Sequence, residues 1–242
     1  MRAFTFSKRC AKEILRDPLN LGFGLGFPVV LLLMLSAIQA NIPVELFEIG
    51  HLTPGICVFG LSFMTLFSAT LISKDRGTAL LERLYTTPMS GTDFILGYTL
   101  PIIPIALGQS AVCYLMAMIL GLKPTFNILT AMIFIIPISF LFIGLGLLCG
   151  SLLNDKQVGG ICGALLTNLC AWLSGVWFDL ELVGEGFKRV AYALPFAHAV
   201  ELERAVLAGN YTGVVEDLLW VVGYGVAVSV GAVLVFLRQM KK

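Results

Sequence analysis

Few residues of this sequence are placed to bind a metal or to act in catalysis. Its two histidines, His51 and His198, have no potential ligands at the spacing that a metal site needs. The six cysteines form no C-x-x-C pair and lie mostly in apolar runs, where cysteine acts as a small core residue. Glu216 and Asp217 are adjacent, but at the expected start of a helix, where the helix dipole already favours acids. We therefore expect no metal site and no catalytic site.

Nucleotide binding and ion coupling are also disfavoured. The sequence has no Gly-x-x-x-x-Gly-Lys-Ser/Thr motif to cradle phosphates, and we expect no cofactor in this chain. Its long apolar stretches contain no Asp, Glu, Lys or Arg, although transporters driven by protons or sodium usually have an ionisable residue at membrane depth. An intramembrane enzyme would need polar catalytic groups at the same depth. A transporter built from these stretches would need its energy from another protein.

Composition and hydropathy indicate a membrane protein. Hydrophobic residues make up 58% and charged residues 13%, against about 45–50% and about 25% in ordinary soluble domains. Six uncharged stretches each have the roughly 20 residues that a helix needs to cross a bilayer. They are residues 21–44, 54–73, 94–122, 124–154, 157–178 and 218–237. We predict an all-α membrane protein with six transmembrane helices in a single transmembrane domain, residues 1–242.

Lys and Arg are unevenly distributed among the predicted connections. With the N-terminus in the cytoplasm, only four of the 16 Lys and Arg residues lie outside: Lys123, Lys188, Arg189 and Arg204. The loop 45–53 has no Lys or Arg, and residues 179–217 are rich in Asp and Glu. Because this bias sets orientation, we predict a multi-pass protein of the cell inner membrane with both termini cytoplasmic.

Residues 1–17 are amphipathic when placed on a helical wheel. Phe4, Phe6, Cys10, Ile14 and Leu15 share the apolar half, and Lys8, Arg9, Lys12 and Arg16 share the polar half. We predict an interfacial helix that lies flat on the inner leaflet, with Phe6 in the apolar layer and the four basic residues facing anionic headgroups. Asp17-Pro18 then turns the chain into the first span. The alternative is a disordered basic tail.

The connection between the second and third spans, residues 74–90, carries a helical pattern of its own. Gly77 can end the preceding helix, Thr78 can cap a new one, and Pro88 can close it. The side chains that would share one face of the new helix are Leu80, Leu81 and Leu84. Such a helix can dock on another protein. The alternative is a solvated connector whose leucines touch the membrane surface.

The segment before the last span, residues 179–213, is too polar to cross a membrane and too apolar in places to be a plain loop. We predict short re-entrant helices that dip into the outer leaflet around Pro195. They would either shape substrate exit or cap the helix bundle.

Small residues and prolines recur within the spans. Gly146 with Gly150, Gly159 with Gly163, and Gly22 with Gly24 and Gly26 would let helices approach closely, either between two copies or within one. Pro101, Pro104 and Pro137 are expected to kink their helices.

In three regions the sequence resembles the type-2 ABC transporter permeases. The first is the run 74–90 followed by Ile95-Leu96-Gly97, and the second is Arg16-Asp17-Pro18 after an amphipathic start. In the outer segment the resemblance rests on Ser174-Gly175, on Leu194-Pro195-Phe196 and on Arg204. The prolines that the family has soon after the Ser-Gly pair are absent here, which leaves the path of this segment open.

The resemblance implies the membrane-spanning subunit of an ATP-driven exporter. A separate ABC ATP-binding subunit would bind ATP and Mg²⁺, and two permease copies, identical or related, would form the pathway within membrane lipid. By resemblance, residues 78–85 form a coupling helix anchored by its three leucines and oriented by Glu82 and Arg83. No nucleic acid partner is expected. The alternative is a scaffold that does not transport, such as an immunity or sensor subunit.

The sequence leaves the identity of the substrate open. Gln109, Ser110, Thr167 and Asn168, among many Phe and Met residues, suit an amphipathic or lipid-like cargo better than a highly charged one. A drug, a lipid, a peptide and a glycan precursor are all compatible with these spans.

Overall fold

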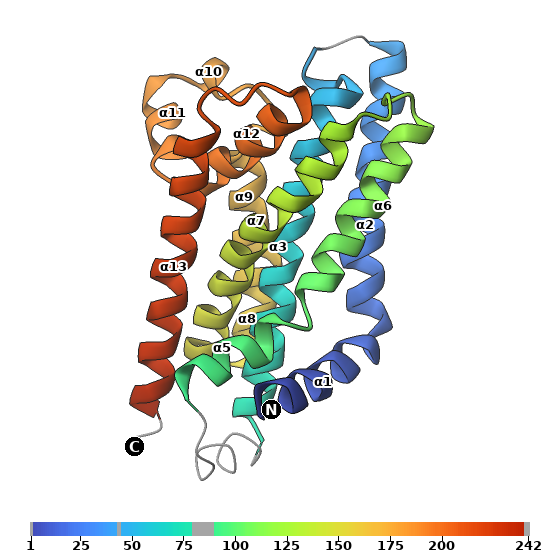
Figure 1. Ribbon diagram of the computed structural model, residues 1–242. Coiled ribbons are helices and arrows are strands. Elements are labelled where there is room, and N and C mark those ends of the chain that lie inside the picture. The colour runs from blue at the N-terminus through green and yellow to red at the C-terminus, as the bar shows by residue number, and fades with distance from the viewer. Residues whose placement is uncertain (1, 43–44, 79–89, 240–242) are drawn as a thin grey trace.

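The computed structural model describes residues 2–42, 45–78 and 90–239, and these residues form helices and turns with no strand among them. Figure 1 shows long helices packed side by side, with both termini at one end of the molecule. We call this the basal end; it includes residues 2–17, 70–78, 90–99 and 150–157. The opposite or distal end includes residues 45–53, 119–127 and 174–217.

Among the described residues, five helical stretches are long and apolar enough to cross a membrane. They comprise α2 (Pro18–Asn41), α3 (Ile49–Arg76), α5 (Gly91–Thr99) continued by α6 (Ile103–Ile119), α7 (Phe126–Leu152) and α13 (Val214–Gln239). The prediction of an all-α, multi-pass membrane protein is confirmed.

The fifth predicted span is built from three short segments that follow one another directly. These are α8 (Asp155–Gly160), the π-helix η2 (Ile161–Leu166) and α9 (Thr167–Leu173). The Thr167 hydroxyl donates to the Cys162 carbonyl, five residues back, at 3.0 Å. The helix ends at Leu173, before the predicted limit at Phe178, because the chain turns at Gly175 with a φ of +68°. A sixth crossing therefore stays a prediction.

The third predicted span is interrupted at Pro101, where a kink was predicted. The helix α5 ends at Thr99, and α6 begins at Ile103 with Pro104 in its first turn. Ser90 begins α5 through a capping box, in which its hydroxyl accepts from the Asp93 amide. Figure 1 shows α5 lying across the basal end and α6 rising from it.

The helix α3 lies at the centre of the bundle, because 89% of its most apolar 18-residue stretch is buried. Its tightest neighbour is α7, where a Cβ on Gly146 would lie 1.8 Å from Ser68 Oγ and one on Gly150 would lie 2.6 Å from the Ala69 carbonyl oxygen. The Thr65 hydroxyl also donates to the Phe142 carbonyl at 2.8 Å. This glycine pair thus packs helices within one chain.

Short helices cover the distal end: η1 (Glu45–Phe47), α10 (Leu180–Val183), α11 (Glu185–Tyr192) and α12 (Pro195–Ala208). The helix α12 packs against α3, α7 and α13, and most of its residues are buried. Short helices in this segment were predicted; their entry into the outer leaflet stays a prediction.

Candidate functional site

At the basal end, the N-terminal helix α1 (Arg2–Leu15) packs on α5 through its predicted apolar face. Phe6, Cys10 and Ile14 are buried, and the Phe6 ring meets the Tyr98 ring edge-on with 4.9 Å between centroids. Gly97 makes room for this contact, since a Cβ there would lie 2.3 Å from Phe6 Cδ1. The amphipathic pattern therefore fixes α1 against the bundle.

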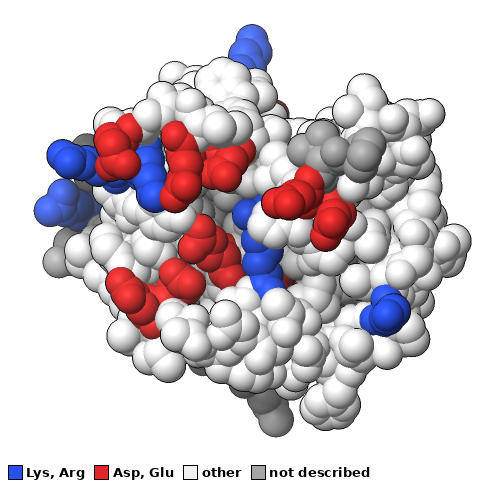
Figure 2. Space-filling model, turned by 90° about the horizontal axis from the view of Figure 1, so that it is seen from above, with Lys and Arg blue, Asp and Glu red and all other residues white. Residues whose placement is uncertain are grey.

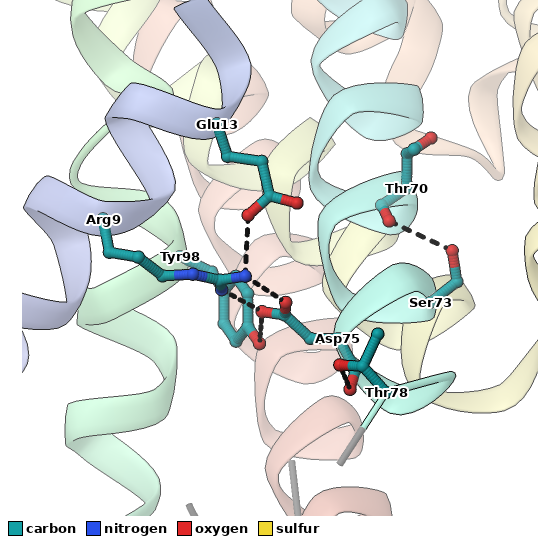
Figure 3. Close-up of polar contacts among 7 residues, drawn as sticks. All are labelled: Arg9, Glu13, Thr70, Ser73, Asp75, Thr78 and Tyr98. Atoms are coloured by element: carbon teal, nitrogen blue, oxygen red, sulfur yellow. Dashed lines mark hydrogen bonds and ion pairs between the residues drawn. The ribbon is translucent and has the colours of Figure 1, made fainter. Parts of the chain in front are cut away.

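This packing brings Arg9 over a buried carboxylate near the end of α3. The Arg9 guanidinium donates to both oxygens of Asp75 at 2.6 and 2.7 Å, and the Tyr98 hydroxyl donates to Asp75 Oδ2 at 2.7 Å. Asp75 is 1% exposed. Arg9 also pairs with Glu13 at 2.7 Å (Figure 3). One carboxylate thus ties together α1, α3 and α5.

The Arg9–Asp75 pair is held by two charge-assisted hydrogen bonds. The hydrogen bond to Asp75 raises the pKa of Arg9 above its ordinary value, although burial acts against it. The Asp75 side chain is buried but that of Arg9 is 39% exposed, so removing Arg9 should cost about 2–3 kcal/mol, less than breaking a fully buried pair. The pair is consequently a strong constraint on where α1 can lie.

Two neighbours of Asp75 reach other elements. The Ser73 hydroxyl lies 3.1 Å from the Thr70 carbonyl oxygen and 3.3 Å from Asp155 Oδ1, at the start of α8, and it can donate to either. The Lys74 ammonium lies 3.9 Å from the Asp17 carboxylate, just ahead of α2. The last turn of α3 is therefore also bound to the beginnings of two further helices.

Arg76 completes this pattern at the end of α7. Its guanidinium donates to the Gly150 carbonyl at 3.0 Å and to the Leu153 carbonyl at 3.2 Å. Carbonyls in the last turn of a helix have no partner within the helix, so a cation placed there satisfies them. We call residues 73–76 the α3 terminal turn; each of its four residues binds a different part of the bundle.

The α3 terminal turn leads directly into the predicted coupling loop. As predicted, α3 ends before Gly77. The Thr78 hydroxyl donates to the Asp75 carbonyl at 3.0 Å, so it binds the end of α3. The other predicted coupling residues, Leu80, Leu81, Glu82, Arg83, Leu84 and Pro88, lie outside the described residues. The described chain resumes at Ser90, which caps α5.

The predicted membrane-interface residues fall into two groups. Lys8, Lys12 and Arg16 are exposed. Phe6 is buried against α5, and Arg9 is engaged by Asp75, so both serve contacts within the chain. Their contact with lipid stays a prediction.

The predicted outer-segment residues are partly brought together at the distal end. Arg204 donates from Nη2 to the Gly175 carbonyl at 3.0 Å and from Nε to the His51 carbonyl at 3.2 Å. Pro195 is the buried first residue of α12, and Ser174 is buried in the turn that precedes Gly175. Arg204 thus joins α12 to the start of α3.

Two buried carboxylates, Asp75 and Glu203, are sites that the sequence reasoning missed. Glu203 is fully buried; the Tyr114 hydroxyl donates to its Oε1 at 2.7 Å, and its Oε2 has no hydrogen-bond partner among the described residues. Burial raises the pKa of Glu203 to about 8. The sequence feature that could have predicted this burial is the position of Glu203, one helical turn from Ala199 and from Leu207 on the apolar side of α12.

The two histidines lie in different parts of the distal end and do not contact each other through their side chains. His51 is exposed near the start of α3, and His198 is buried beside Asp217 at 2.7 Å, with its ring stacked on Trp220 at 4.8 Å between centroids. Among the described residues no three His, Cys, Asp or Glu side chains are grouped to hold a metal ion. His198 therefore joins α12 to α13.

Comparison with protein families identifies this architecture. Residues 2–208 match the ABC-2 type transporter family, so the match covers most of the chain. A search of curated proteins found no match. The chain belongs to the ABC-2 type transporter family, as its resemblance to type-2 permeases implied, and it is a transmembrane component of an ABC transporter.

Proposed function

We propose that this chain is the permease subunit of an ATP-driven ABC exporter, coupled through residues 78–85 to a separate ATPase that binds ATP and Mg²⁺. The observation that supports it is the α3 terminal turn. It adjoins the predicted coupling loop, and its side chains bind α1, α5, α7, α8 and the residue before α2. A force on the loop would therefore act on several helices at once.

The coupling step is a rigid-body displacement in this proposal. Closure of the ATPase subunits on ATP pulls the coupling helix, and Asp75 transmits the pull to α1 and α5 through Arg9 and Tyr98. Arg76 transmits it to the end of α7. Packed helices of this kind switch between discrete arrangements, which suits alternation between inward-open and outward-open states.

We assign the basal end to the cytoplasm and the distal end to the outside of the inner membrane. The exposed acids of the distal end are Glu45, Glu48, Asp179, Glu181, Glu185 and Glu216, and Figure 2 shows acidic side chains spread over that face. Of the described Lys and Arg residues, most lie toward the basal end. In this arrangement residues 155–173 form the sixth crossing, and α10–α12 form the re-entrant segment.

The translocation pathway is assigned to an aromatic groove between α2 and α9, completed by a second permease copy. The groove has a volume of about 680 Å³ and Phe59 and Phe63 of α3 among its lining residues. Phe23 and Trp172 are more than half exposed on its two sides, and Asn168 adds a polar group. This lining suits an amphipathic cargo.

The test is co-purification from detergent-solubilised native membranes. The wild-type chain is compared with a Leu80→Asp, Leu84→Asp double variant. The control is Leu182→Asp, Val183→Asp, which makes the same chemical change at two exposed distal residues. We expect a nucleotide-binding subunit with the wild type and the control, and its loss from the first variant.

Two results contradict the proposal. If no ATPase accompanies the wild-type chain, the permease has no energy source and the scaffold alternative replaces it. If the distal control loses the ATPase as completely as the first variant, the docking assignment is wrong. Substrate-dependent ATP hydrolysis by the assembled complex then separates a transporter from a scaffold.

A further inference from the structure

A groove at the distal end contains a cation, Arg204, that forms no ion pair with any of the described residues. The groove has a volume of about 630 Å³ and is bordered by the start of α3, the α6–α7 turn and the end of α12. Arg204 lines it, and among the described residues this guanidinium binds only carbonyl oxygens, those of His51 and Gly175. Burial lowers the pKa of Arg204 to about 10, so desolvation outweighs the nearby acids.

The rest of the groove favours an anion of limited size. Lys123, in the α6–α7 turn, supplies a second positive charge, and among the described lining residues Glu48 is the one carboxylate. Thr125 and Asn210 offer polar groups that can donate hydrogen bonds. In Figure 2 a basic group lies in the central hollow of this face with acidic side chains close to it, and other basic side chains lie at the edges of the face. A free anion approaching this face is repelled, so a ligand that arrives along the membrane has the advantage.

The surroundings of the groove are those of a lipid–water boundary. Leu122 and Leu207 line it together with the charged residues. Just beyond the α6–α7 turn, Ile119 is 78% and Phe126 is 79% exposed, at the ends of two candidate membrane spans. A phosphate in the groove would therefore have its acyl chains beside apolar side chains.

We propose that this groove binds the phosphate headgroup of an anionic phospholipid, held by Arg204 and Lys123, with the acyl chains along α6 and α7. The bound lipid supplies an ion-pair partner for Arg204 and secures α12 against the start of α3. This site is separate from the coupling loop and from the groove between α2 and α9. It requires membrane insertion but no ATPase partner.

The test measures binding of lipid to the purified full chain in nonionic detergent by native mass spectrometry. Phosphatidylglycerol, which is anionic, is compared with phosphatidylcholine, which is zwitterionic, and with inorganic phosphate as a competitor. We expect preferential phosphatidylglycerol adducts. Lys123→Ala should weaken binding about fivefold, the effect of one basic residue near a membrane surface. Lys123→Arg should retain the affinity.

Two further variants define the site. Arg204→Gln should weaken phosphatidylglycerol binding by at least about tenfold, because it removes charge-assisted hydrogen bonds. Arg189→Ala is the matched control: it removes an exposed distal Arg that does not line the groove, and it should leave binding unchanged. Since Lys123 is an exposed turn residue, its variant gives a result even if Arg204→Gln does not fold.

The outcomes are distinct. Equal binding by the wild type and Lys123→Ala, or an equal loss with Arg189→Ala, overturns the site. Equal adducts with the anionic and zwitterionic lipids overturn the requirement for an anion. If inorganic phosphate displaces the lipid at millimolar concentration and binds alone, the phosphate site stands and phospholipid is overturned as its source.

Discussion

Replacing Glu203 by Gln should stabilise the protein at alkaline pH and much less at acid pH. Glu203 is buried between α12 and α6, and the Tyr114 hydroxyl is the hydrogen-bond donor to its carboxylate in the described structure. Gln retains the shape and the Oε1 acceptor but cannot ionise. The substitution therefore isolates the cost of a buried negative charge.

The sign and size follow from the pKa of Glu203, about 8 in the folded chain against 4.5 ordinarily. Below pH 4.5 both states are protonated, and Glu203 carries no ionisation penalty. Between pH 4.5 and 8 the unfolded chain has lost the proton that the folded chain keeps, so stability falls as pH rises. The total loss above pH 8 is on the order of 5 kcal/mol at 1.36 kcal/mol per pKa unit.

The assay is thermal unfolding of the detergent-solubilised protein at pH 5 and pH 8. We expect Glu203→Gln to raise stability by about 4 kcal/mol more at pH 8 than at pH 5, a difference of roughly 10 °C in Tm. Any cost of placing the Gln amide is the same at both pH values and cancels. Glu216→Gln, which removes an exposed carboxylate, controls for the loss of one negative charge. An equal shift at both pH values would refute the reasoning.

Two further predictions concern the basal contact and the bundle core. Arg9→Ala should lower the free energy of unfolding by about 2–3 kcal/mol, because it leaves the buried Asp75 without its part-exposed cation, whereas Glu13→Ala should cost about 1 kcal/mol or less, because both partners of that pair are part-exposed. Denaturation of both variants measures the difference, and equal losses would contradict it. Gly146→Ala should destabilise the protein by about 1–3 kcal/mol because its Cβ has no room against α3, while Gly108→Ala, which has no neighbour within 4 Å, should be neutral or stabilising. Thermal unfolding of the pair tests this, and a neutral Gly146→Ala would show that α3 and α7 can separate at no cost.

The helices of this protein follow from hydropathy, but their ends depend on single residues. The prediction that α3 ends at Gly77 is confirmed. Glycine is unfavourable inside a helix, so a helix tends to end there. The end of α9 was predicted five residues late, because Ser174 to Phe178 is as free of charge as the helix before it. Hydropathy measures transfer into a membrane, and the turn at Gly175 is a backbone property that it does not register.

The buried polar contacts could not be predicted from local patterns in the sequence. The wheel of residues 1–17 assigned Phe6 and Arg9 to opposite halves, and both contact the bundle because a long arginine reaches around the edge of the apolar face. No residue near Arg9 in the sequence predicts its contact with Asp75, which lies 66 residues further along the chain. Such a pair becomes visible only when the tertiary packing of α1 on α5 is known.

The helix α3 connects the two ends that these arguments treat separately. Its first turn gives the His51 carbonyl to Arg204, and its last turn gives Asp75 to Arg9. Between them the helix is buried and bonded to α7 through the Thr65 hydroxyl, so we expect it to move as a rigid rod. A displacement imposed at the basal end must therefore reach the distal groove. The proposed lipid in that groove and the proposed partner at the coupling loop would both act on this helix, and we expect the two sites to be coupled through it.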